Sequence, residues 1–295
     1  MEPFLKRLAN GEVLIADGAI GTMLMERGLE PGRPPESFNL THPDVLEGVA
    51  REYLESGADI IQTNTFGGSR LKLQACGLGD RVLEINRNAV LAVRRAVGDS
   101  AYVYGSCGPT GQFLEPYGQV SVDEMYAVFK EQISALFGAG VDVICVETMS
   151  DLNEATCAIK AAKNSAQVPV MATMTFDHTP KGFYTIMGVT IKEAVKGLEE
   201  AGADVIGSNC GNGIDRMVAI AREFRQYTEL PVAIQANAGI PELVGDRAVY
   251  PETPDFMAER AGELLSLGVS VIGGCCGTTP AHIRALRTAV DSLRR

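Results

Sequence analysis

The fold of this chain is decided by the stretch Ala201-Gly202-Ala203-Asp204-Val205-Ile206-Gly207-Ser208-Asn209, which returns three more times. The other copies are Ser56 to Thr63, Ala139 to Glu147 and Leu267 to Gly273. In each copy a glycine suits the C′ position that ends a helix, where a positive φ costs little. The β-branched residues that follow are typical of a buried parallel strand. The repeat therefore predicts units in which a helix leads into a buried strand.

Four further apolar runs lie between these copies: Val13 to Ala16, Tyr102 to Gly105, Val168 to Thr175 and Val232 to Gln235. Segments with helical character separate the runs, for example Met125 to Phe137, Ile191 to Glu200 and Met217 to Gln226. Eight strand–helix units over 295 residues predict an α/β fold, a single (β/α)8 TIM barrel. No low-complexity stretch or linker divides the chain, so we expect one domain over residues 1–295.

The composition excludes several classes of protein. Hydrophobic residues make up 46 % of the chain, enough for a sizeable core, and the net charge of −11 argues against nucleic acid as a partner. No segment approaches about 18 uninterrupted apolar residues, so no membrane span is expected. We expect no signal peptide either, and interpret the apolar start, Phe4 to Leu8, as a helix that closes the barrel bottom rather than a membrane anchor. Seven cysteines at scattered spacing do not form a secreted disulfide framework, which favours a reduced, cytoplasmic, soluble protein.

Barrel enzymes place their chemistry at the carboxyl ends of the strands. The predicted strand ends of this chain carry unusual polar groups: Asp17, Thr63, Ser106, Glu147, Asn209, Cys210, Asn237, Cys275 and Cys276. We therefore expect the functional site at this rim.

The adjacent cysteines Cys275 and Cys276 are flanked by glycines and directly follow an apolar run, and Cys210 follows another. Vicinal cysteines rarely bridge each other, because the ring would be strained. Three thiolates from two strand ends are the protein half of a catalytic zinc site, which keeps a fourth position open. A redox pair and three small buried hydrophobic residues remain alternatives, although the Cys-x-x-Cys spacing of redox pairs is absent. The other cysteines are expected to fill the core: Cys76, Cys107, Cys145 and Cys157.

A set of motifs, in order across essentially the whole chain, resembles the homocysteine S-methyltransferase family. The motifs are Asp17-Gly18-Ala19-Ile20-Gly21-Thr22, Thr63-Asn64-Thr65-Phe66, Val146-Glu147-Thr148, Asn209-Cys210-Gly211, Asn237-Ala238-Gly239 and Gly273 to Pro280. With Gly108-Pro109-Thr110-Gly111 added, the chain is most similar to the homocysteine-binding barrel of cobalamin-dependent methionine synthase.

The resemblance implies a Zn²⁺ site whose ligands are Cys210, Cys275 and Cys276. Asn237 matches a family position that can fill the fourth zinc site before substrate arrives. The alternative for Asn237 is a turn-forming asparagine before Ala-Gly.

The resemblance also implies a set of substrate-binding residues. Asp17 and Glu147 match the residues that hold the homocysteine ammonium, and Gly18 and Thr63 match those that bind its carboxylate. We place Asn209 in the same set. The alternatives are a turn or cap for Asp17 and a plain strand residue for Thr63, whereas a glutamate at position 147 is costly to bury unpaired. Three histidines match no family position: His42 and His282, expected at helix starts, and His178, expected in the loop from Asp177 to Gly182.

The implied activity is transfer of a methyl group to the thiol of homocysteine, giving methionine. Family members take the methyl group from methylcobalamin, betaine or S-methylmethionine. Betaine is disfavoured because the chain has no Trp for a cation–π cage. A single barrel leaves no room for a cobalamin domain, so we expect a methylcorrinoid that is free or carried by a separate protein, above an open rim. Other hypotheses remain open: a sulfonium donor, a different thiol acceptor, or a non-catalytic thiol- or metal-binding barrel that docks a corrinoid protein.

Overall fold

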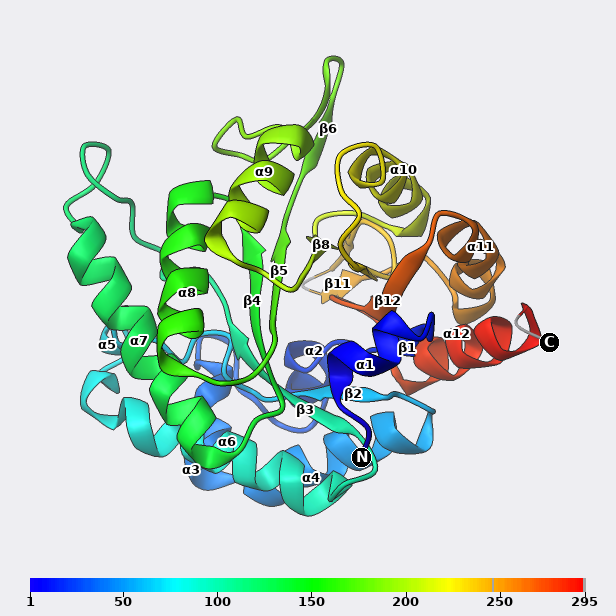
Figure 1. Ribbon diagram of the computed structural model, residues 1–295. Helices are drawn as coiled ribbons and strands as arrows, with labels where there is room; N and C mark the ends of the chain where they lie inside the picture. The colour runs from blue at the N-terminus through cyan, green and yellow to red at the C-terminus, as the bar shows by residue number, and fades with distance from the viewer. Residues whose placement is uncertain (246, 294–295) are drawn as a thin grey trace.

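The computed structural model describes residues 1–245 and 247–293, and its core is a parallel barrel ringed by helices (Figure 1). The barrel strands in chain order are β1 (Leu14–Ile15), β2 (Ile60–Gln62), β3 (Tyr102–Cys107), β4 (Val143–Met149), β5 (Val170–Met174), β8 (Val205–Asn209), β9 (Val232–Ala236) and β12 (Val269–Gly274). Their order in the sheet is β1-β12-β9-β8-β5-β4-β3-β2, and a parallel bridge between Ala16 and Ile60 joins the two edge strands. The predicted (β/α)8 barrel is confirmed.

Helices cover the outside of the barrel and lie in the segments that connect its strands. They are α1 (Phe4–Ala9), α2 (Gly21–Glu26), α3 (Phe38–Thr41), α4 (Pro43–Glu55), α5 (Arg70–Gln74), α6 (Val82–Val97), α7 (Val122–Ala139), α8 (Leu152–Ser165), α9 (Ile191–Ala201), α10 (Ile214–Phe224), α11 (Pro254–Ser266) and α12 (Pro280–Leu293), with 3-10 turns η1 (Pro35–Ser37) and η2 (Gly79–Arg81). Helix α1 closes the bottom as expected, since Phe4 and Leu8 pack into the barrel interior against Leu14 and Tyr102. Among the described residues, no helix combines the length and apolarity needed to cross a membrane.

The repeated sequence unit has a clear structural role at the bottom of the barrel. The glycines Gly57, Gly140, Gly202 and Gly268 all have positive φ, between 72° and 97°, as the repeat predicts. In three copies the following aspartate accepts a backbone N–H from the start of a neighbouring strand. The pairs are Asp59 with Ile15, Asp142 with Val103 and Asp204 with Val170, and the N···O distances are 2.8–2.9 Å. Each unit therefore ends a helix and ties the next strand to its neighbour.

Each of these aspartates also has a basic partner. Asp59 lies 3.1 Å from both Arg7 and Arg287, Asp142 lies 2.7 Å from Arg94, and Asp204 lies 3.0 Å from Lys163. The carboxylates at the bottom of the barrel are thus paired and hydrogen-bonded.

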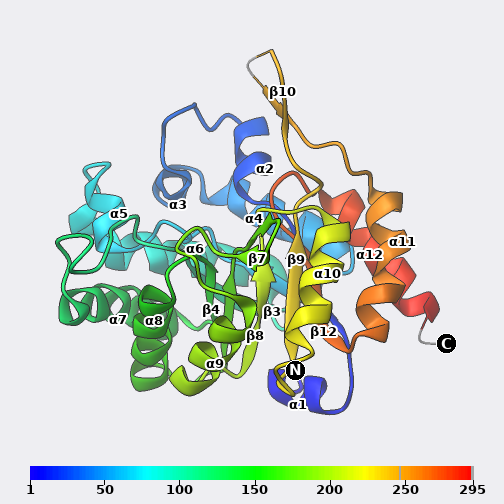
Figure 2. The same cartoon turned by 90° about the horizontal axis from the view of Figure 1, so that it is seen from above.

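Two antiparallel hairpins extend from the loops at the other end. The first, β6 (Asp177–Thr179) and β7 (Gly182–Tyr184), follows β5, and the second, β10 (Glu242–Val244) and β11 (Arg247–Val249), follows β9. Figure 2 shows the β10 hairpin projecting at the end of the barrel opposite α1. The prediction of a loop from Asp177 to Gly182 is therefore wrong, because His178 pairs with Phe183 across the β6–β7 hairpin. Gly182, which begins β7, has a φ of 119°.

Candidate active site

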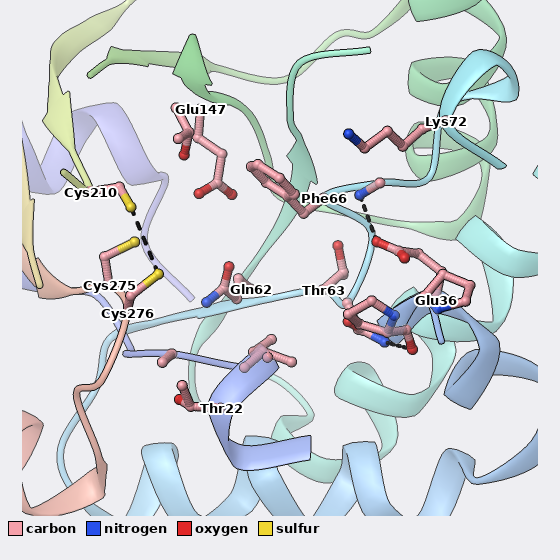
Figure 3. A pocket seen from close by; sticks show the side chains of 18 of the residues that line it. Thr22, Glu36, Gln62, Thr63, Phe66, Lys72, Glu147, Cys210, Cys275 and Cys276 are labelled. Carbon is pink, nitrogen blue, oxygen red and sulfur yellow. Dashed lines mark hydrogen bonds between the residues drawn. The ribbon is translucent and has the colours of Figure 1, made fainter. Parts of the chain in front are cut away.

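A cavity of about 750 Å³ opens at the carboxyl ends of the strands. Its walls come from the loops after β1, β2, β3, β4, β8, β9 and β12. Figure 3 shows Cys210, Cys275 and Cys276 on one side of this pocket, with Lys72 and Glu36 on the opposite side. Of the residues singled out in the sequence, the three cysteines, Thr63 and Glu147 line the cavity directly.

The three sulfur atoms converge, as the sequence predicts. The Sγ atoms of Cys210 and Cys276 are 3.7 Å apart, and all three Sγ atoms lie within 4.8 Å of one another. Zinc–sulfur bonds of about 2.3 Å at tetrahedral angles require sulfurs about 3.8 Å apart. The spacing therefore fits a single zinc ion bound by three thiolates.

The backbone holds the sulfurs in this arrangement at some conformational cost. Cys210 has a φ of 61°, in the left-handed region that a non-glycine residue rarely adopts. Its N–H donates to the Gln235 carbonyl at 3.1 Å, and the Cys275 N–H donates to the Ala236 carbonyl at 2.7 Å. Strand β9 thus lies between the two cysteine-bearing strands and fixes the height of both loops.

The thiols also influence one another. A hydrogen bond from Cys210 lowers the pKa of Cys276, whereas the hydrogen bond with Cys210 raises the pKa of Cys275. The cluster therefore favours at least one thiolate, whose negative charge suits a bound cation.

Asn237 follows β9, between the two cysteine loops. Its side-chain Oδ1 is buried and has no hydrogen-bond partner in the described part of the chain. A buried carbonyl oxygen without a partner is costly, so this atom suits a ligand or metal contact. The three cysteine sulfurs match a donor type that zinc prefers.

Glu147 ends the buried part of β4 and is 5 % exposed. Its carboxylate accepts the hydroxyl proton of Ser106 and, at 3.3 Å, an N–H of Asn209. Burial raises the pKa of Glu147 to about 7. Among the described residues no lysine, arginine or histidine forms an ion pair with this carboxylate, so it can receive a cationic group of a ligand.

Asp17 lies deeper than the sequence alone indicates. It borders a small cavity of about 10 Å³ that is also lined by residues of α4 and α6, and its Oδ2 accepts the Gln62 N–H at 2.9 Å. Its Oδ1 is buried with no partner in the described chain. Burial, together with the charge of Glu147, raises the pKa of Asp17. Asp17 is therefore a buried carboxyl group that does not line the main cavity, whereas Gln62, whose N–H it accepts, does.

The side chains of Thr63 and Asn209 form hydrogen bonds within the protein. The Thr63 hydroxyl lies 2.7 Å from that of Thr65, which in turn donates to the Ser106 carbonyl, and it accepts the Ser106 N–H at 3.2 Å. Because Thr65 donates to Ser106, the proton of Thr63 is directed at Thr65. The hydroxyl of Thr63 thus joins β2 to β3.

Asn209 acts in a similar way on the loop after β4. Its Oδ1 accepts the Thr148 N–H at 2.8 Å and the Thr173 hydroxyl at 2.7 Å, while its Nδ2 donates to Thr148 Oγ1 at 2.7 Å. Thr148 has a positive φ of 59°, which this amide stabilises. Asn209 therefore orients Glu147 and Thr148.

Gly18 is fixed by close packing. A Cβ at this position would lie 2.5 Å from Thr278 Oγ1 and 2.9 Å from the Tyr53 hydroxyl, so only glycine fits. The Gly18 carbonyl accepts an N–H of Gln62 at 2.7 Å. The glycine predicted from the motif thus sets the close approach of the β1 loop to the loop after β12.

Several pocket residues were not singled out in the sequence. Gln62, Glu36, Lys72 and Tyr250 all line the cavity, and Glu36 is 4 % exposed. Glu36 lies in η1 and Lys72 in α5, neither of which carries a recognisable motif, and Tyr250 directly follows the β10–β11 hairpin. Of these four, only Gln62 has a sequence signal, since it lies at the end of a predicted strand.

The fold and the site define the class of protein: a TIM barrel whose mouth holds three converging cysteines that could bind a metal ion, with the buried carboxyl group of Glu147 nearby. Residues 14–290 match the family model described as "Homocysteine S-methyltransferase". The chain belongs to the homocysteine S-methyltransferase family, a family of methyltransferase enzymes, and the resemblance seen in its motifs is confirmed.

Two curated relatives are named methionine synthase. The protein from Mycobacterium tuberculosis (strain ATCC 25618 / H37Rv) is 35 % identical over 303 residues, covering 96 % of this chain and 25 % of the relative. The protein from Mycobacterium leprae (strain TN) is 34 % identical, covering 94 % of this chain and 24 % of the relative. The chain thus spans about a quarter of the length of these relatives.

Solved structures support the fold. The metallated form of the homocysteine methyltransferase MmuM from Escherichia coli superposes with a TM-score of 0.81 at 22 % identity, covering 97 % of this chain and 99 % of that chain. The oxidized form of the same protein gives a TM-score of 0.79.

Proposed function

We propose that this chain is a zinc-dependent S-methyltransferase that moves a methyl group to the thiol of homocysteine and so produces methionine. The observation that carries the proposal is the convergence of three sulfurs from β8 and β12 beside an unpaired, buried Glu147. Membership of the homocysteine S-methyltransferase family supports homocysteine as the acceptor.

Cys210, Cys275 and Cys276 would hold the zinc ion, with Asn237 Oδ1 as a fourth contact before substrate binds. When bound there, zinc would lower the pKa of a substrate thiol and leave its sulfur electron-rich at neutral pH. The chain itself contributes the rigid placement of the three thiolates by the loops flanking β9.

Glu147 would bind the ammonium of homocysteine, with Asp17 adding negative potential. Both carboxylates carry raised pKa values because they are buried, and a cation in the pocket would favour their ionised forms. For the substrate carboxylate we propose the Gly18 N–H. A contact from the Thr63 hydroxyl would require its bond to Thr65 to open first.

For the methyl donor we propose a methylcorrinoid, either free or carried by a separate protein. Several segments that follow the barrel strands carry large exposed apolar side chains, of which Met25 and Phe66 line the cavity: Met25, Phe66, Phe113, Tyr117, Ile186, Met187, Ile240, Leu243 and Val249. An exposed apolar rim is typical of a surface that meets a large partner. In the transfer, the homocysteine sulfur would attack the methyl carbon in line with the cobalt–carbon bond, whose electron pair stays on cobalt.

A sulfonium donor is the second candidate. The side of the pocket away from the cysteines holds the buried carboxylate of Glu36 and the half-exposed ring of Phe66. A carboxylate and an aromatic face together suit a small cation.

A reducing compartment would keep the free thiols of the site available as ligands. We therefore propose a cytoplasmic location.

The test uses zinc-loaded protein with homocysteine and either methylcobalamin or S-methylmethionine. Methionine formation and the appearance of cob(I)alamin are measured together. Turnover with methylcobalamin supports a methylcorrinoid donor, and turnover only with S-methylmethionine refutes it. Stoichiometric zinc with no methyl transfer to any thiol would instead favour a binding barrel, and equal use of simple thiols by the wild type and E147Q would favour a different acceptor.

A further inference from the structure

Gln62 is a pocket residue that contacts both of the β1-loop residues that the proposed function uses. Its backbone N–H donates to Asp17 Oδ2 at 2.9 Å, and its side-chain Nε2 donates to the Gly18 carbonyl at 2.7 Å. Gln62 ends β2 and lines the cavity, and in Figure 3 its side chain lies between the cysteines and Thr63. A single residue of β2 therefore restrains the loop that would receive the amino-acid part of the substrate.

The orientation of the Gln62 amide is fixed by a second residue of the cavity wall. The Tyr104 hydroxyl donates to Gln62 Oε1 at 3.3 Å, and it accepts an N–H of the Gln235 side chain at 3.4 Å. The Gly18 carbonyl can only accept a hydrogen bond, so Nε2 of Gln62 faces it and Oε1 faces Tyr104. Tyr104 and Gln235 both line the cavity and are buried. The Gln62 amide is therefore held at both of its ends.

The direction of the Gly18 N–H, the proposed donor to the substrate carboxylate, depends on the peptides on either side of Gly18. This N–H shares a planar peptide with the Asp17 carbonyl, which accepts the Gly274 N–H at 2.9 Å. On the other side of Gly18, the Gln62 amide holds the next carbonyl. Glycine has more backbone freedom than any other residue, so bonds from neighbouring strands fix these two peptides.

A backbone N–H that is held in one direction is a preorganised donor for a carboxylate. Preorganisation raises affinity because less freedom is lost on binding. The effect of the Gln62 side chain is confined to the carboxylate, because the bond from Gln62 to Asp17 comes from the backbone and survives replacement of the side chain. The side chain therefore acts on one charged group of an amino-acid substrate and leaves the proposed ammonium contacts in place.

We propose that Gln62 is a positioning residue that makes the site select thiols carrying an α-carboxylate, because its side chain holds the Gly18 peptide in place. The inference rests on the proposed binding of homocysteine at Gly18 and Glu147, and it deepens that proposal by naming what distinguishes homocysteine from a simpler aminothiol. The matched control is Gln112, another glutamine of the cavity wall, which is exposed and lies in the loop after β3.

The experiment compares wild type, Q62M, Y104F and Q112M in the presence of zinc. The two ligands are homocysteine and 3-amino-1-propanethiol, which is homocysteine without its carboxylate. Isothermal titration calorimetry gives both dissociation constants, and their ratio is the preference for homocysteine. We expect Q62M to lower this preference about 10-fold, the size of a hydrogen bond to a charged group, with unchanged affinity for 3-amino-1-propanethiol. Y104F, which keeps the Gly18 bond, should lower it about threefold, and Q112M should match the wild type.

A wild-type preference in Q62M overturns the proposal, and so does an equal loss of affinity for both thiols, which is what a merely structural role would give. If Q62M does not fold, the same two outcomes in Y104F overturn it. A wild type that binds the two thiols equally, or binds neither, also overturns it. Failure of the proposed function is separate: a wild type that prefers homocysteine but transfers no methyl group to it refutes the methyltransferase, and the comparison of variants still decides this inference.

Discussion

The carboxylates at the two ends of the barrel differ in their burial and in their partners. At the bottom, Asp59, Asp142 and Asp204 each accept a backbone N–H and pair with arginine or lysine. At the mouth, Asp17 and Glu147 are more deeply buried and have no basic partner among the described residues. Burial raises the pKa of both mouth carboxylates.

The difference separates stability from function. Satisfied carboxylates lock strands together, whereas buried unpaired ones cost stability and persist where a ligand compensates them. The orphan Oδ1 atoms of Asp17 and Asn237 and the positive φ of Cys210 fall at the same end. Substitutions at the mouth should therefore reduce metal binding and activity, whereas substitutions at the bottom should reduce the free energy of unfolding.

The largest effect is expected for Cys276→Ala. Removing one of three thiolates should lower zinc affinity by more than the about 10- to 100-fold typical of outer-shell partners, and methyl transfer should be lost. Zinc content is measured by atomic emission and activity by methionine formation. Cys157→Ala on α8, away from the cavity, is the control and should keep its zinc. A C276A variant with full zinc and activity would mean that the mouth is not a metal site.

Glu147→Gln should damage function and improve stability at high pH. Loss of the charged partner of the ammonium should lower kcat/KM for homocysteine by about 10- to 100-fold, the size of a charge-assisted hydrogen bond. The Ser106 hydroxyl can still donate to the amide oxygen at this position.

The stability effect follows from the raised pKa. Below the ordinary value near 4.5 the group is protonated in both the folded and the unfolded state, so it costs nothing. As the pH rises from about 4.5 to about 7, the unfolded state ionises this group while the folded state keeps the proton, so stability falls by up to about 3 kcal/mol and then levels off. Ligand-free E147Q should therefore be more stable than wild type at pH 8 and nearly equal to it at pH 5, as measured by urea unfolding. A wild-type protein without this slope would mean that Glu147 has a partner in solution.

Thr63→Val tests whether that hydroxyl belongs to the fold or to the substrate. Its bonds to Thr65 and Ser106 predict a loss of about 1–3 kcal/mol in unfolding free energy. We expect the KM for homocysteine to change by less than about threefold, far below the effect of removing a charged contact. A large rise in KM with unchanged stability would show that the hydroxyl turns to the substrate carboxylate. Thr63→Ser, which keeps the hydroxyl, should restore both values.

The smallest effect is expected at the bottom of the barrel. Asp204→Asn keeps an acceptor for the Val170 N–H but removes the ion pair with Lys163, whose side chain is 38 % exposed. Such partly exposed pairs contribute about 0.2–1 kcal/mol. Unfolding free energy should fall by that amount with kcat/KM unchanged, and Lys163→Met should lose a similar amount. A change in kcat/KM on substitution of Asp204 would contradict the conclusion that the bottom of the barrel serves stability alone.

The sequence predicted the barrel and the cysteine cluster because both depend on local pattern. The glycine and β-branched residues of each copy specify a helix end and a strand, and Cys210, Cys275 and Cys276 each follow directly on such a strand. In a parallel barrel the strand ends meet at one rim, so the sulfurs had to lie at the same end. The buried position of Glu147 follows from the same argument.

Contacts between loops were not predictable in this way. The β6–β7 hairpin replaced an expected loop at His178, and Tyr250 lines the cavity because it follows the β10–β11 hairpin and precedes Glu252, which is anchored at the start of α10. Thr63 and Asn209 carried the right motif, but their hydrogen bonds serve neighbouring strands and loops in the structure.

By itself, the sequence determined a repeated helix–strand unit and the strand ends at which thiols and carboxylates occur, since periodicity and glycine placement are local properties. Only the tertiary structure decided that β8 and β12 flank β9, so that the three sulfurs lie around one point. It also decided which carboxylates find partners, because desolvation and pairing depend on residues far apart in the chain.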